Sequence, residues 1–123
     1  MSDRGLVIEL LKQVHNACCV VLQRFVPICR PEDFTNTPEG MEKLDAICMQ
    51  LIAIGEGLKK IDQMTDGELL PRYPSVDWKK AKALRDIRSH HYFDLNAEAI
   101  FEVCKRHMPV LEKTVVQIIL DIS

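Results

Sequence analysis

A short segment at residues 79–91 is a local concentration of side chains that are suited to acting on a phosphate. Its basic residues are Lys79, Lys80, Lys82, Arg85 and Arg88, its one carboxylate is Asp86, and it ends in His90 and His91. A guanidinium offers a phosphate planar, bidentate donors and a permanent charge. An imidazole beside a carboxylate forms an acid-base unit. These groups favour metal-independent cleavage of RNA, in which the ribose 2'-hydroxyl attacks the neighbouring phosphate, and DNA would resist because it lacks that hydroxyl.

The spacing within this segment determines which side chains can act together. Residues three or four positions apart lie on the same face of a helix. In this segment one such face would carry Lys82, Arg85, Arg88 or Ser89, and Tyr92. Asp86 and His90 are four residues apart, so we expect the carboxylate to orient the imidazole. On a continuous α-helix Arg85 and His90 point about 140° apart. Either the helix ends or loosens near Ser89, or a second subunit completes the cleft.

Apolar residues recur at steps of three and four along most of the chain, which predicts amphipathic helices. The first predicted helix covers residues 6–25, with Ser2 or Asp3 as its cap, and it stops at Pro27. A proline-rich loop follows, with one short helical turn after Pro31.

A second helix is predicted to begin at Thr37 and Pro38 and to end near residues 65–67. Its middle is apolar on nearly all sides. This pattern indicates either a central position in a bundle or one face in the core and another in a dimer interface. We favour the dimer.

The third predicted helix contains the basic segment at residues 79–91, and a fourth predicted helix follows it. Asp77 is the expected cap of a third helix that starts at Trp78 and runs through residues 78–92. Asn96 is the expected cap of a fourth helix, which Pro109 should kink or divide.

The composition indicates one folded domain over residues 1–123, with 47% hydrophobic and 28% charged residues. The net charge of -2 means that any electrostatic attraction to RNA must come from a local basic surface.

We recognise no signal peptide or uninterrupted apolar span, so we expect a cytoplasmic protein without a membrane partner. The five cysteines lack paired spacing, and we expect them to be reduced and mostly buried. We expect no cofactor and no metal site, and we interpret His15 and His107 as structural.

The stretch RDIRSHHYF resembles the motif of HepT-like HEPN ribonucleases, in which Arg85, four intervening residues, His90, one residue and Tyr92 match in order. IGEGLKKI at 54–61, RYPSVDW at 72–78 and the proline-containing final helix are also similar to that family. The resemblance implies an all-α, up-and-down HEPN bundle of four to five helices. It further implies a homodimer whose paired motifs form a cleft.

In the family that this chain resembles, the protein is a toxin that cleaves RNA. Its antitoxin is an MNT-type nucleotidyltransferase, which adds AMP to the motif tyrosine. By position that tyrosine is Tyr92. The modification would add bulk and negative charge where RNA phosphate should bind. Two other interpretations remain open, namely a non-catalytic module that partners a nucleotidyltransferase and a purely structural helical dimer.

Several further residues have both a functional and a structural interpretation. Glu56 lies between two glycines, which indicates close helix approach, and it either pairs with Lys59 or Lys60 or reaches Arg85 and holds it. Lys79 and Lys82 form either a solvated face or a track for the RNA backbone. Arg88, Ser89 and His91 are possible supporting residues, and His91 occupies the intervening position of the motif.

Overall fold

The computed structural model describes residues 2–89 and 96–123, and within these ranges every regular element is helical. The α-helices are α1 (Ser2–Phe25), α2 (Pro38–Met64), α3 (Trp78–Ala83), α4 (Ala97–Glu102) and α5 (Met108–Ile122). Three short 3-10 helices are η1 (Pro31–Phe34), η2 (Leu70–Arg72) and η3 (Leu84–Ser89), and a π-helical turn, η5 (Val103–His107), joins α4 to α5. The all-α fold class is confirmed.

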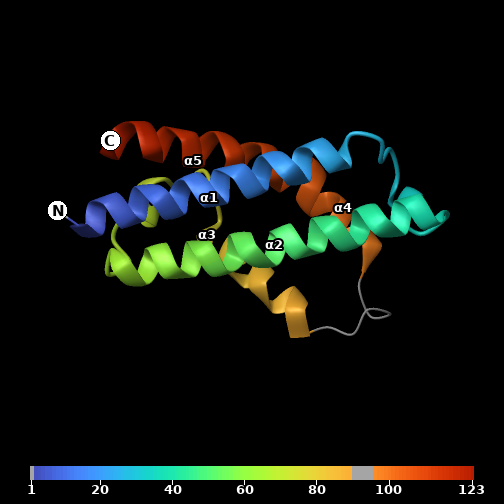
Figure 1. Ribbon diagram of the computed structural model, residues 1–123, viewed down its shortest axis with the longest axis horizontal. Coiled ribbons are helices and arrows are strands. Elements are labelled where there is room, and N and C mark those ends of the chain that lie inside the picture. Colours follow the sequence, from blue (N-terminus) through green and yellow to red (C-terminus); the bar gives the residue numbers. More distant parts are fainter. Residues whose placement is uncertain (1, 90–95) are drawn as a thin grey trace.

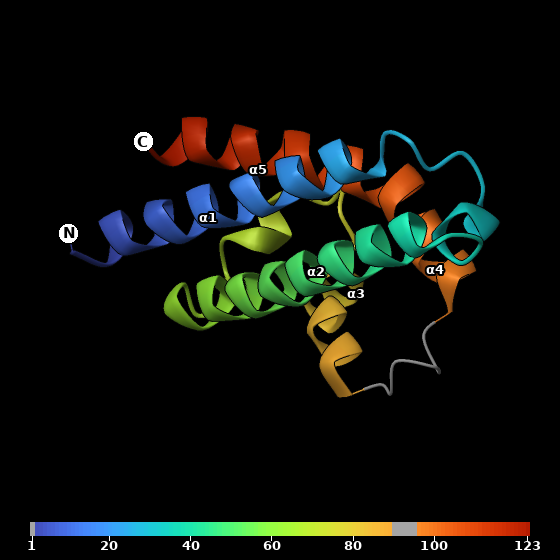
Figure 2. The same cartoon turned by 45° about the vertical axis from the view of Figure 1, so that its right-hand side comes forward.

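The three long helices form the body of the molecule (Figure 1). α2 and α5 both run antiparallel to α1, so the two chain ends lie at the same end of the molecule. α3 and η3 pack against α2 (Figure 2), and α3 also lines a pocket together with α5. α2 therefore has a central position between α1 and the α3–η3 segment, which was one of the two interpretations of its apolar surface. The dimer interface that we favoured stays a prediction.

α1 ends at Phe25, as its sequence pattern indicated, but it begins at Ser2, so Ser2 and Asp3 lie within the helix and not at a cap before it. Its buried stripe packs against α2 and α5 and consists of Val7, Leu11, Val14, Ala17, Cys18 and Val21. The helix stops two residues before Pro27, which has no backbone N–H to donate. By length and composition alone, Asp3–Phe25 would be long enough and apolar enough to cross a membrane, but in this structure its apolar stripe faces the protein core.

The predicted caps of the later helices are confirmed. The Thr37 hydroxyl oxygen accepts a hydrogen bond from the Gly40 amide at 3.0 Å, Asp77 caps α3 through the Lys80 amide at 3.1 Å, and Asn96 caps α4 through the Ala99 amide at 3.1 Å. The chain leaves α2 through two residues with positive φ, Asp66 at 54° and Gly67 at 70°. This is the left-handed ending that glycine permits without strain.

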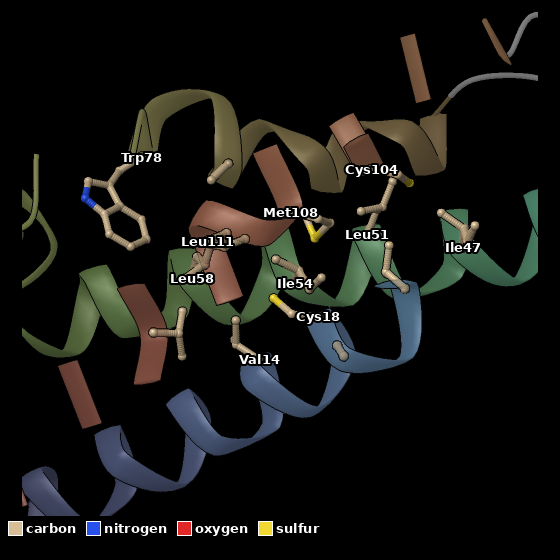
Figure 3. Packing of buried hydrophobic residues seen from close by; sticks show 14 of the residues in the cluster. Val14, Cys18, Ile47, Leu51, Ile54, Leu58, Trp78, Cys104, Met108 and Leu111 are labelled. Carbon is tan, nitrogen blue, oxygen red and sulfur yellow. The ribbon is translucent and has the colours of Figure 1, made fainter. Parts of the chain in front are cut away.

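The buried apolar side chains of all five α-helices belong to a common core (Figure 3). Leu51, Ile54 and Leu58 of α2 lie at its centre, against Cys18 of α1 and Met108 of α5. At one end, the ring of Phe25 lies 5.2 Å from that of Phe101 and 6.3 Å from that of Phe34. These ring contacts join α4 and η1 to the end of α1.

Pro109 divides the last helix, as predicted, and the structure shows how. Proline lacks an N–H, and its ring clashes with the carbonyl four residues earlier in an α-helix. The chain widens into the π-helical turn at residues 103–107 immediately before Pro109, which then occupies the first turn of α5. Proline is tolerated there because the first N–H groups of a helix have no intrahelical partner.

The third helix and two of the cysteines differ from the predictions. α3 ends at Ala83, and residues 84–89 continue as 3-10 helix rather than as the long α-helix that we expected. Cys18, Cys48 and Cys104 are buried as expected, but Cys19 and Cys29 are exposed. Burial raises the pKa of Cys18 to about 12, that of Cys104 to about 12 and that of Cys48 to about 11.

Candidate active site

The loop before α3 is anchored at three points, which fixes where the basic segment starts. The indole N–H of Trp78 donates to the Tyr73 carbonyl at 2.9 Å. The Tyr73 hydroxyl donates to the Asp121 carboxylate of α5 at 2.7 Å, and this bond raises the pKa of Tyr73. Trp78 is itself part of the core, so α3 begins from a rigid point.

The backbone of the α3–η3 segment lies directly on α2 at Gly55. A Cβ atom at this position would lie against the Arg85 backbone nitrogen, well inside contact distance, and 2.9 Å from the Lys82 carbonyl oxygen. A Cβ on Gly57 would instead meet Val14 of α1 at 2.8 Å. Residues two apart on a helix point about 200° from each other. The glycines beside Glu56 thus allow close approach on opposite sides of α2, as the sequence indicated.

In a 3-10 helix such as η3, residues three positions apart lie directly above one another, so their side chains point to the same side. Leu84 and Ile87 are partly buried against the core. Arg85 and Arg88 follow them on the next edge, with side chains 30% and 52% exposed. The tighter helix therefore keeps the two guanidinium groups on one edge at the surface while the apolar pair holds η3 in place.

Three ion pairs connect the basic segment with its surroundings. Lys82 lies 2.7 Å from Asp62 of α2, Arg85 lies 3.7 Å from Asp86, and Arg88 lies 3.7 Å from Glu56. Glu56 therefore pairs with Arg88, and not with Arg85 or the two lysines that we considered. The reason is local: in a 3-10 helix Arg88 lies directly one turn beyond Arg85.

A shallow hollow lies beside the contact between α2 and the α3–η3 segment and is lined by several cations. We call it the cationic hollow; its lining residues are Lys59, Asp62, Gln63, Lys79, Lys82, Ala83 and Arg85. Four of these side chains are cations and one is a carboxylate, which already pairs with Lys82. The hollow is therefore a local basic surface on a protein whose net charge is -2. Such a surface attracts an anionic strand that the whole molecule would not.

The structure brings part of the predicted site together. Lys79, Lys82 and Arg85 share the cationic hollow, whereas Asp86, Arg88 and Ser89 are exposed on η3. The Ser89 hydroxyl donates to the Asp86 carbonyl at 2.7 Å, which closes the last turn of η3. His90, His91 and Tyr92 lie outside the described residues, so their predicted roles stay predictions.

Sequence reasoning missed two residues of the hollow. Lys59 was considered only as a partner of Glu56, and Asp62 was not considered at all. Both lie on α2, some 20 residues before the basic segment, and no spacing rule relates them to it. Only the close approach at Gly55 brings them beside Lys82 and Arg85.

Comparison with known proteins identifies the family. The family model described as Ribonuclease HepT-like matches residues 8–118. The chain belongs to the HepT-like ribonuclease family. Among curated proteins, it is 34% identical over 97 residues to a protein of Methanocaldococcus jannaschii named "Putative RNase", an alignment that covers 74% of this chain and 77% of that protein. No solved structure gives a significant match.

A second relative extends the similarity over nearly the whole HepT-like chain. It is a protein of Caldanaerobacter subterraneus subsp. tengcongensis, also named "Putative RNase", with 29% identity over 109 residues. The alignment covers 89% of this chain and 90% of that protein. The match to the family model includes α2, α3 and η3, so the cationic hollow lies within the residues that the family model covers.

Proposed function

We propose that this HepT-like chain is a metal-independent endoribonuclease whose active site adjoins the cationic hollow. The observation that carries the proposal is the position of Arg85. Its guanidinium lines the hollow beside Lys79 and Lys82, and the chain continues from η3 into His90 and Tyr92. Family membership and the names of the two relatives support a ribonuclease over a structural helical protein.

The proposed reaction uses the 2'-hydroxyl of the RNA itself. This oxygen attacks the adjacent phosphorus, the bond from phosphorus to the 5'-oxygen breaks, and a cyclic phosphate and a 5'-hydroxyl end are formed. His90 accepts the proton from the 2'-hydroxyl or returns one to the 5'-oxygen, and Asp86 orients it. Arg85 stabilises the charge that develops on the phosphorane oxygens. Lys79 and Lys82 hold the flanking backbone.

The wider proposal is a cytoplasmic toxin that acts as a homodimer and is neutralised by an MNT-type nucleotidyltransferase. In a dimer, the second copy would supply a second His90, so one imidazole could act as base and the other as acid. Addition of AMP to Tyr92 would place a phosphate close to the guanidinium groups of η3. The modified protein would then repel or exclude RNA phosphate at the same position.

The direct test is cleavage of total RNA in EDTA by protein purified without a nucleotidyltransferase. Wild type is compared with His90→Ala, and His107→Gln serves as a matched control because His107 is exposed on η5. All three proteins must show the same oligomeric state and melting temperature. We expect cleavage by wild type and His107→Gln and none by His90→Ala. Absence of cleavage by all three proteins would favour a non-catalytic partner of a nucleotidyltransferase instead.

A further inference from the structure

The edge of the molecule where α1 packs on α5 holds a cluster of potential metal ligands far from the cationic hollow. The cluster consists of His15 and Cys19 of α1 and Glu112 of α5, whose donor atoms all lie within 4.8 Å of one another. His15 Nε2 is 2.7 Å from Glu112 Oε2, and Cys19 Sγ is 3.5 Å from the same nitrogen. His15 and Cys19 are four residues apart, a spacing that puts two side chains on one helix face.

The arrangement around the His15 ring distinguishes between two kinds of chemistry. A catalytic thiol needs the imidazole to hold the sulfur with one nitrogen and the carboxylate with the other. Here the sulfur and the carboxylate oxygen both approach Nε2. The three donors therefore converge on one point instead of forming a relay. Convergence of three ligand atoms from two helices is the geometry of a metal site.

We propose that His15, Cys19 and Glu112 form a Zn²⁺ site that joins α1 to α5 and leaves a fourth position open to solvent. A thiolate and an imidazole favour zinc over Mg²⁺ or Ca²⁺, which prefer oxygen ligands. Three protein ligands with one open position is a common zinc arrangement. Cys19 is exposed and the other two residues are partly buried, so the ion can enter from outside.

The donor atoms lie within 4.8 Å of one another, so their separations must change by no more than about 1.2 Å to accept the ion. With bonds of about 2.3 Å to sulfur and about 2.1 Å to nitrogen and oxygen, tetrahedral zinc holds its sulfur and nitrogen ligands about 3.6 Å apart. The Cys19–His15 distance is already 3.5 Å. The nitrogen and oxygen ligands would be about 3.4 Å apart. The His15–Glu112 hydrogen bond of 2.7 Å must therefore open by about 0.7 Å as the ion replaces its proton.

The electrostatics of the cluster also fit a cation. Partial burial, followed by the nearby Glu112 charge, raises the pKa of Cys19 above its usual value. Binding of Zn²⁺ reverses this effect, because a coordinated thiol loses its proton.

The test uses Co²⁺ as a spectroscopic probe for the zinc site, on full-length protein stripped of metal. A bound thiolate gives cobalt a sulfur-to-metal charge-transfer band, which we expect in wild type at one ion per chain. Cys19→Ser should abolish the band and weaken Zn²⁺ binding by about 100-fold or more, since loss of an outer partner alone costs 10- to 100-fold. Cys29→Ser is the matched control, because Cys29 is also exposed but lies outside the cluster.

A second readout is thermal stability, which does not depend on ribonuclease activity. Zn²⁺ at about 100 times its dissociation constant should raise the melting temperature of wild type by about 10 °C and leave Cys19→Ser unchanged. Glu112→Gln retains a hydrogen-bonding partner for His15 but loses the charge, and it should weaken Zn²⁺ binding without unfolding the protein. A wild-type protein without the charge-transfer band, or equal Zn²⁺ binding by wild type and Cys19→Ser, would overturn the proposal.

Discussion

The α1–α5 edge and the α3–η3 edge of this protein both carry polar side chains, but the two edges are built for different tasks. At the α1–α5 edge, a thiol, an imidazole and a carboxylate converge within 4.8 Å. At the α3–η3 edge, four cations spread around an open hollow with one carboxylate among them. A convergent mixed donor set suits a small ion, and a spread of like charge suits a long anionic chain. The comparison separates the edge that we propose to bind a metal ion from the edge that we propose to bind RNA.

The largest expected difference concerns the thiols of α1. Cys18 and Cys19 are neighbours, but burial raises the pKa of Cys18 to about 12. The raised pKa keeps the Cys18 thiol protonated at neutral pH, and burial also blocks access of a reagent to the sulfur. We expect alkylation at pH 8, followed by mass spectrometry, to label Cys29 and Cys19 and to leave Cys18 and Cys104 unmodified. Addition of Zn²⁺ should protect Cys19 alone from alkylation. Protection of Cys29 as well would contradict a specific zinc site at Cys19.

The next prediction concerns the contact that builds the α3–η3 edge. Gly55→Ala should displace η3, because the added methyl group would meet the backbone of Arg85 and Lys82. Overpacking of this kind costs about 1–3 kcal/mol of unfolding free energy and should also abolish RNA cleavage. Gly5→Ala is the control, since a Cβ at Gly5 meets nothing within 4 Å. Chemical denaturation measures both variants, and unchanged stability of Gly55→Ala would contradict the described packing.

A smaller effect is expected for the charges of the cationic hollow. Lys79→Ala should weaken RNA binding and lower the slope of log affinity against log salt by about 0.7, the value for one contact with a single-stranded phosphate. Lys12 of α1 is exposed and does not line the hollow, so Lys12→Ala should leave the slope unchanged. Fluorescence anisotropy measures the slopes, with both lysine variants made in a His90→Ala protein so that the RNA is not cleaved during the titration. Equal slopes for the two lysine variants would show that the cationic hollow does not bind the RNA backbone.

The smallest expected effect is that of Glu56→Gln. The Glu56–Arg88 pair is 3.7 Å long and both side chains are 52% exposed, so solvent screens it. Exposed pairs of this kind contribute about 0–1 kcal/mol, and we expect no more than a few tenths here. Thermal unfolding should therefore barely change. A large loss of stability would show that Glu56 does more than pair with Arg88.

The same two edges show why sequence reasoning succeeded for one region and failed for another. The basic segment is contiguous and Asp77 is a local cap signal, so the start of α3 was predictable, and the glycines beside Glu56 indicated a close helix approach without indicating its partner. The change to 3-10 helix at Leu84 was not predictable, because it depends on how η3 rests on α2. Glu112 lies 97 residues from His15, and only the antiparallel packing of α5 on α1 brings them together. No spacing rule contains that information.

The central claim is that the α3–η3 edge performs metal-independent RNA cleavage and that the α1–α5 edge does not. The most direct test compares initial cleavage rates in EDTA for wild type, Arg85→Ala and Cys19→Ser, below the melting temperature of the metal-free proteins. Loss of one group that stabilises developing charge costs about 100- to 1,000-fold, so Arg85→Ala should be slower by that factor. Cys19→Ser should match wild type. Equal rates for wild type and Arg85→Ala, or loss of cleavage in Cys19→Ser, would contradict the account.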